Sequence, residues 1–158
     1  MDNRIVPIIN AARAGDVDLL KASITDDVDI NGHDEKGYTP LIIACYSNRL
    51  EAAKLLIDAG ADVNAADFGG NTALMGASFK GYPGITQLLI NNGAALNMQH
   101  GNGGTALMFA AMFGRNEILK LLINNGADKT VVDSRGLSVF DLAAQQGNEE
   151  GIDILESN

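Results

Sequence analysis

The sequence predicts an all-α fold built from five stacked helix-turn-helix units, each about 33 residues long. One observation is a recurring segment: "GNGGTALMFAAMFG" at 101–114 has counterparts at 35–48, 68–81 and 134–147. The other is the leucine stripe in "AAKLLI", "ITQLLI" and "ILKLLI", which a single unit could not bury. The units cover 1–33, 34–66, 67–99, 100–132 and 133–158 without insertions, which predicts one domain spanning 1–158.

The glycines that open the segment at 101–114 also suggest a phosphate-binding loop before a helix. The segment has no Gly-Lys-Ser/Thr ending and no G-x-G-x-x-G spacing, and "LNMQH" before it is too poor in apolar residues for a buried strand. Recurrence at a fixed period explains the glycines as turn residues, so we expect no nucleotide or other cofactor.

Each unit begins with a turn and a first helix. A glycine recurs where a turn before a helix requires positive φ, and a hydroxyl residue follows at N-cap spacing. Pro40, which Pro7 matches in unit one, stands at a helix position that tolerates a missing N–H. The glycines are Gly37, Gly70, Gly103 and Gly136, and the caps are Thr39, Thr72, Thr105 and Ser138.

Small residues and a second helix complete the unit. Pairs of small residues in the first helix allow close helix packing, and a glycine ends each inner second helix in the left-handed conformation. Asn64 and Asn97 in the following loop are interpreted as loop hydrogen-bonding residues. The pairs are Ala11-Ala12, Ala44-Cys45, Ala77-Ser78, Ala110-Ala111 and Ala143-Ala144, and the glycines are Gly60, Gly93 and Gly126.

"GYTPLIIA" followed by "AAKLLIDAGADVNA" resembles the ankyrin-repeat family, and the resemblance covers essentially the whole chain. It implies antiparallel helix pairs with protruding hairpin loops, stacked into a curved solenoid. It also implies binding of other proteins, mainly through the hairpin tips and the exposed side of the first helix, which line a concave surface. Asn64 and Asn97 resemble a hydroxylation target of some animal members, although hydrogen bonding is the favoured interpretation.

The chain departs from the family pattern at a few positions. In unit one, Val6 replaces the capping hydroxyl and Asp27 the helix-ending glycine, and unit five stops after "GIDILESN". Both end units have fewer family marks and more charge, so they are expected to act as caps. His100 replaces the turn aspartate and Ala95 the aspartate of "GAD", which predicts a looser hairpin between units three and four.

Positions that contact partners in the family carry over onto hairpin tips and first helices of this chain. The tip positions are Glu35, Lys36, Tyr38, Phe68, Gly69, Asn71, Gly101, Asn102, Gly104, Ser134, Arg135 and Leu137. The helix positions are Tyr46, Ser47, Phe79, Lys80, Met112, Phe113, Gln145 and Gln146.

Five of the eight aromatic residues fall on these positions, although the framework does not require them there. We predict that Tyr46, Phe79 and Phe113 form a row across units two to four, bordered by Ile42, Met75 and Met108. The alternative is that the rings pack between repeats. Phe109 and Phe140 are predicted to be core, and Tyr82 fits either environment. The predicted partner-binding residues are Tyr38, Tyr46, Phe68, Phe79, Lys80, Met112 and Phe113.

The net charge of −9 argues against nucleic acid and anionic membrane surfaces as partners. The five units carry net charges of −3, −2, 0, +1 and −5, so the centre is neutral and the ends are acidic. This distribution either steers a basic partner or keeps the terminal units soluble. The single cysteine excludes an internal disulfide, and no apolar run could span a bilayer.

Residues for catalysis or metal binding are not grouped in this sequence. His33 and His100 are loop residues two units apart, and no Cys/His cluster has zinc spacing. Cys45 has no histidine nearby, and Asp34, Asp67 and Asp133 occupy turn positions. We therefore expect no enzyme activity and no metal site.

The leading hypothesis is a monomeric protein-interaction module that acts as an adaptor or scaffold. The alternative is an inhibitor or immunity-type protein that blocks the active site of a paired enzyme or toxin. "MDNRIVPIINAARAGD" has no signal-peptide pattern, which favours the cytoplasm, with export or the periplasm as the alternative if a signal was removed.

Overall fold

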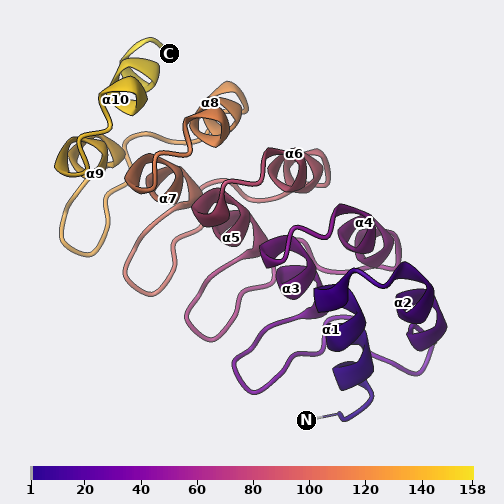
Figure 1. Cartoon of the computed structure of the whole chain (residues 1–158). Helices are drawn as coiled ribbons and strands as arrows, with labels where there is room; N and C mark the ends of the chain where they lie inside the picture. The colour runs from indigo at the N-terminus through magenta and orange to yellow at the C-terminus, as the bar shows by residue number, and fades with distance from the viewer. Residues whose placement is uncertain (1) are drawn as a thin grey trace.

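The computed structural model describes residues 2–158 and contains ten helices within that range. Figure 1 shows the odd-numbered first helices in one row and the even-numbered second helices in another, with hairpins projecting beside the first row. The predicted all-α architecture is confirmed for this range, which has isolated β-bridges but no strands. The helices are α1 (Ile5–Ala14), α2 (Val17–Ser23), α3 (Pro40–Tyr46), α4 (Leu50–Asp58), α5 (Ala73–Lys80), α6 (Pro83–Asn91), α7 (Ala106–Met112), α8 (Asn116–Asn124), α9 (Val139–Gln145) and α10 (Glu149–Glu156).

The predicted N-caps are confirmed in units two to five. The side chains of Thr39, Thr72, Thr105 and Ser138 each accept a hydrogen bond from the backbone N–H three residues later. Unit one differs because Val6 lies inside α1, and Arg4 at the N-cap makes no side-chain capping bond.

Hairpins before α3, α5 and α9 are closed by an aspartate. The carboxylate of Asp67, for example, accepts from the backbone N–H groups of Gly69 and Asn71 at 2.8 and 2.9 Å. Asp34 and Asp133 make the same pair of bonds in their own hairpins. All four turn glycines have positive φ, between 78° and 83°, as predicted.

Backbone hydrogen bonds join each hairpin to the next. The N–H groups of Phe68, Gly101 and Ser134 donate to the carbonyl oxygens of Lys36, Gly69 and Asn102, at 3.2, 2.9 and 3.0 Å. The hairpins therefore form a continuous ladder along the first-helix row, and they position the side chains on that side relative to one another.

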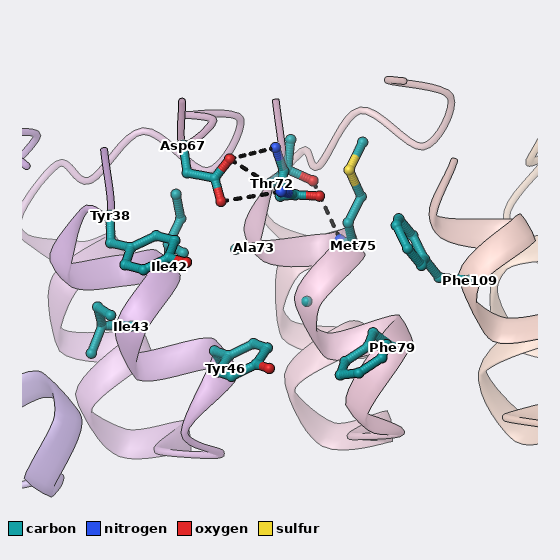
Figure 2. Close-up of a pocket in the computed structure, with 12 residues that line it drawn as sticks. Tyr38, Ile42, Ile43, Tyr46, Asp67, Thr72, Ala73, Met75, Phe79 and Phe109 are labelled. Carbon is teal, nitrogen blue, oxygen red and sulfur yellow. Dashed lines mark hydrogen bonds between the residues drawn. The ribbon is translucent and has the colours of Figure 1, made fainter. Parts of the chain in front are cut away.

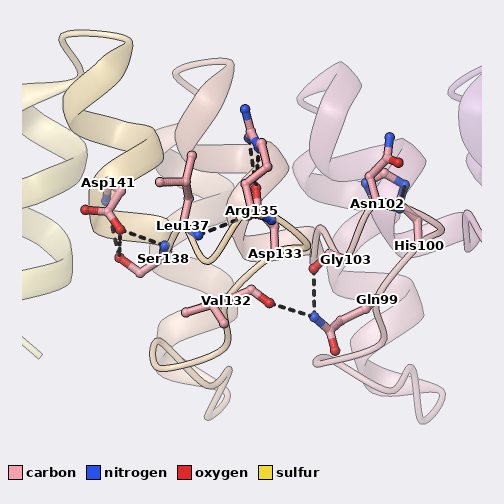
Figure 3. A network of polar contacts seen from close by, with 10 residues as sticks. All are labelled: Gln99, His100, Asn102, Gly103, Val132, Asp133, Arg135, Leu137, Ser138 and Asp141. Carbon is pink, nitrogen blue, oxygen red and sulfur yellow. Dashed lines mark hydrogen bonds and ion pairs between the residues drawn. The ribbon is translucent and has the colours of Figure 1, made fainter.

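The hairpin of residues 100–104 keeps the same backbone turn without an aspartate. Its closing bond, from His100 N–H to Gly104 O, is 3.0 Å long. The His100 ring accepts only one backbone N–H, that of Asn102 at 3.4 Å. Gln99 compensates, since its amide donates to the carbonyl oxygens of Gly103 and Val132 (Figure 3). The expected loosening is thus limited to lost side-chain bonds.

The core lies between the two rows of helices. Leu20, Leu56, Leu89, Leu122 and Leu155 of the second helices are fully buried, which confirms the leucine stripe as core. At the far end of the units, the amide oxygens of Asn64 and Asn97 accept from the backbone N–H groups of Ala95 and Asp128, at 2.7 and 2.8 Å. The interpretation of these asparagines as loop hydrogen-bonding residues is confirmed.

Candidate functional site

The inner face is the surface formed by the hairpins together with the exposed side of α3, α5 and α7. Three aromatic rings lie in a row on it, as their spacing predicts. The ring centroids of Tyr46 and Phe79 are 6.4 Å apart and nearly parallel, and those of Phe79 and Phe113 are 4.7 Å apart and edge-to-face. Tyr46 is 46% exposed and Phe113 44% exposed, so both ends of the row are accessible from solvent.

Lys80 joins the row through its charge. Its ammonium nitrogen lies 4.9 Å from the centroid of the Tyr46 ring, within the range of a cation–π interaction. The side chain thereby bridges units two and three and places a positive charge at the end of the row near the C-termini of α3 and α5.

A cleft of about 330 Å³ opens beside the row, between the hairpins and the first helices. Figure 2 shows Tyr46 reaching from α3 toward Phe79 on α5, with Phe109 approaching from α7. Tyr38 and Asp67 line the cleft at the hairpin end. The row and the cleft are therefore one continuous, mainly apolar feature.

Three predictions about the borders of the row need correction. Met75 and Met108 are 2% and 1% exposed, and Ile42 is 7% exposed, so they lie under the inner face rather than beside the row. Met75 and Ile42 contribute buried side chains to the lining of the cleft, whereas Met108 lines a neighbouring cavity.

Phe109 and Phe140, both predicted to be core, pack against the core but are only partly buried. Phe109 lines the cleft because the equivalent position in unit three is Gly76, which has no side chain to cover the ring. Phe140 occupies the position of the buried Leu41, Leu74 and Leu107, but within residues 2–158 no further helix packs on that side of α9. Tyr82, half-buried beside α6, packs against the core.

Phe68 and Met112, the remaining predicted site residues, both lie outside the cleft. Phe68 is 71% exposed at a hairpin tip, where its ring contacts that of His33 at 5.1 Å, outside the lining of the cleft. Met112 lines the neighbouring cavity of about 500 Å³, together with His100 and Arg135. The structure thus groups Tyr38, Tyr46, Phe79, Lys80 and Phe113, and it separates Phe68 and Met112 from them.

Gly76 is the cleft residue that sequence reasoning missed. It stands at the repeat position occupied by Ile43, Phe109 and Leu142 in units two, four and five, and by the polar Asn10 in unit one. Comparison of the units at this position would have revealed the glycine as the exception. A Cβ added to Gly76 would lie 3.3 Å from the Tyr46 ring, so the glycine leaves the space that the cleft occupies.

Ionisable groups outside the cleft are held in structural roles. Burial raises the pKa of the Cys45 thiol to about 12, so the thiolate nucleophile is scarce at neutral pH. The side chain of Arg135, 2.8 Å away, and backbone N–H groups lower the pKa of Asp133 below its usual value. Within residues 2–158, no three His, Cys, Asp or Glu side chains are grouped as a metal site would require.

Comparison with known proteins links this geometry to a family. A family model described as ankyrin repeats, in three copies, matches residues 8–100 and again residues 74–158. No curated protein matches the chain. None of the helices within the described range combines the length and apolar character needed to cross a membrane.

Proposed function

The chain belongs to the ankyrin-repeat family, whose members are generally protein–protein interaction modules without enzyme activity, and we propose that it binds a protein partner through the inner face of units two to four. In this proposal the chain acts as an adaptor or scaffold. The observation that supports it is the aromatic row, which lies beside an apolar cleft and whose end rings are exposed.

Aromatic rings are the side chains that most often anchor protein interfaces. Tyr46 and Phe113 leave nearly half of their surface in solvent, which is costly unless a partner covers it. The face around them carries little net charge, since units three and four have net charges of 0 and +1, while units one, two and five are acidic. An apolar centre with an acidic surround fits a partner with a basic surface.

The test is affinity capture from native host extract with wild type and with the triple variant Tyr46→Ala, Phe79→Ala, Phe113→Ala. We expect the main partner to bind the variant at least about tenfold more weakly, because interface anchors contribute roughly 2 kcal/mol or more each. Leu19→Ala is the matched control, since Leu19 is 49% exposed but lies on α2, away from the inner face. Thermal unfolding checks that each variant is folded. Equal capture by the triple variant and the wild type would contradict the proposal.

The captured partner also distinguishes recruitment from inhibition. An adaptor leaves the activity of its partner unchanged when the two proteins are mixed in equal amounts. Loss of that activity at equal stoichiometry would favour the inhibitor or immunity-type alternative. The measurement is the partner's own assay with wild-type protein, and the triple variant serves as the inactive control.

A further inference from the structure

The cleft exists because one side chain is missing from the repeat pattern. Ile43, Phe109 and Leu142 fill their repeat position, whereas Gly76 leaves it empty in the middle of α5. Glycine is a poor residue for a helix interior. Gly76 does not have the positive φ that would require glycine, so its effect on the structure is the space beside Tyr46.

The dimensions and lining of the cleft match an apolar side chain. Ile43, Tyr46, Met75, Phe79 and Phe109 all contribute to its lining, so the lining is mainly apolar. A volume of about 330 Å³ is near the lower end of the range for small-molecule sites, roughly 300–1,000 Å³. The empty position has the shape of a missing Ile, Leu or Phe side chain, so a side chain of that kind from another protein would complete the packing.

The carboxylate of Asp67, at the hairpin end of the cleft, is not paired with a basic side chain in the part of the chain that the structure describes. Asp67 accepts hydrogen bonds from the backbone of Gly69 and from the backbone and side chain of Asn71, all of them neutral groups. The equivalent Asp133 is paired with Arg135 at 2.8 Å. Among residues 2–158, Asp67 has no such partner, so a cation from outside would complement it.

We propose that the cleft at Gly76 receives one bulky apolar side chain of the protein partner, and that a neighbouring Lys or Arg of the partner pairs with Asp67. The inference rests on the proposed function, because it assumes that the inner face binds protein. It goes further by naming the side chains that this face selects.

The first experiment uses a phage-displayed library of random peptides as the probe. The baits are wild type, Gly76→Leu, which fills the cleft, and Gly84→Leu. The last is the matched control, because Gly84 is an exposed position on α6 and an added Cβ meets no atom within 4 Å. We expect wild type and Gly84→Leu to enrich peptides that carry a bulky apolar residue close to Lys or Arg.

Synthetic copies of an enriched peptide then give affinities by fluorescence polarisation. We expect Gly76→Leu to bind at least about tenfold more weakly than Gly84→Leu, since an interface anchor is lost. Replacing the apolar residue of the peptide with Ala should weaken binding to wild type by a similar factor. This second comparison needs no variant of the protein, so it holds even if Gly76→Leu folds poorly.

Asp67→Asn tests the charged part of the proposal. The amide oxygen of asparagine can still accept the hairpin N–H bonds, so the turn is retained. We expect wild type to bind the enriched peptide more tightly than its copy with Ala in place of Lys or Arg. Asp67→Asn should bind the two peptides equally. A preference for the basic residue that survives in Asp67→Asn would overturn this pairing.

The outcomes separate this inference from the proposed function. Phe113→Ala removes an anchor of the inner face that does not line the cleft. If Phe113→Ala weakens peptide binding and Gly76→Leu does not, the inner face binds protein and the inference about the cleft is wrong. If neither variant weakens binding, or if no peptide is enriched, both proposals are contradicted.

Discussion

Equivalent positions in the inner units and in the fifth unit have different environments. Ala12, Cys45, Ser78 and Ala111 are fully buried against the following unit, whereas Ala144, at the same repeat position, is exposed. The turn glycines differ in the same way. A Cβ on Gly103 would meet the next hairpin, and a Cβ on Gly136 would meet no atom within 4 Å. The residue type follows the repeat, but the energetic cost of changing it depends on the neighbouring unit.

The largest expected effect is overpacking of the helix interface between units four and five. Ala111→Leu adds a bulky side chain at a site with no exposed surface, and we expect it to lower the free energy of unfolding by about 3 kcal/mol or more. Ala144→Leu makes the same change at the exposed equivalent, where we expect an effect within about 0.5 kcal/mol. Urea unfolding followed by circular dichroism measures both values.

Equal destabilisation by the two leucine variants would break the comparison. It would mean that contacts within the fifth unit restrict the side chain at position 144 as strongly as contacts between units restrict it at position 111. α7, which carries Ala111, packs against α9, so the destabilisation by Ala111→Leu reflects the packing of units four and five.

A smaller difference is expected at the turn glycines. Gly103→Ala and Gly136→Ala both place a Cβ on a residue with positive φ, 83° and 78°, which costs about 1–2 kcal/mol. Only Gly103→Ala also brings the Cβ to 2.7 Å from the backbone nitrogen of Ser134. We therefore expect Gly103→Ala to be more destabilising than Gly136→Ala by about 1–3 kcal/mol in urea unfolding.

Amide hydrogen exchange sharpens the result for Gly103→Ala. The N–H of Ser134 donates to Asn102 O across the two hairpins, and the added Cβ should disturb this bond. Faster exchange at Ser134 is expected in Gly103→Ala but not in Gly136→Ala. Unchanged exchange at Ser134 would mean that the added Cβ leaves the hydrogen bond between the two hairpins intact. That result would contradict the steric explanation.

The sequence was sufficient to predict the features that each unit determines by itself. Thr72 caps α5 and Gly70 adopts positive φ because these roles depend on residues a few positions away. The row of Tyr46, Phe79 and Phe113 followed from the 33-residue spacing alone, since stacked units place equivalent positions side by side. Its role in binding remains a prediction.

The errors arose where two units together determine the environment. Phe109 packs against the core but stays partly exposed beside Gly76 of the unit before it. Phe140 stays partly exposed because no further helix packs on that side within residues 2–158. The repeat spacing predicts Met75 at the border of the row, but its side chain is buried under the inner face. A repeat pattern averages over units, so it hides a position at which one unit departs from the rest.

The smallest effect concerns the hairpin aspartates, where Asp133 has a cation and Asp67 does not. Arg135 and the backbone N–H groups lower the pKa of Asp133 in the folded protein below the ordinary value of about 3.9. The ionised carboxylate therefore stabilises the fold at pH values above that ordinary pKa. This contribution is lost as the pH falls through the lowered pKa of the folded state. Asp133→Asn, which does not titrate, should have a lower urea midpoint than wild type at pH 7.

The pH dependence of that difference decides whether the ionised carboxylate is responsible. We expect the gap between the urea midpoints of wild type and Asp133→Asn to narrow as the pH is lowered from about 5 to about 2. In an Arg135→Ala background the gap should be smaller and should close at higher pH, because the largest cause of the lowered pKa is gone. A gap that stays constant with pH would assign the difference to a non-titrating effect of replacing a carboxylate oxygen by an amide NH₂, such as a changed contact with Arg135, rather than to ionisation of Asp133.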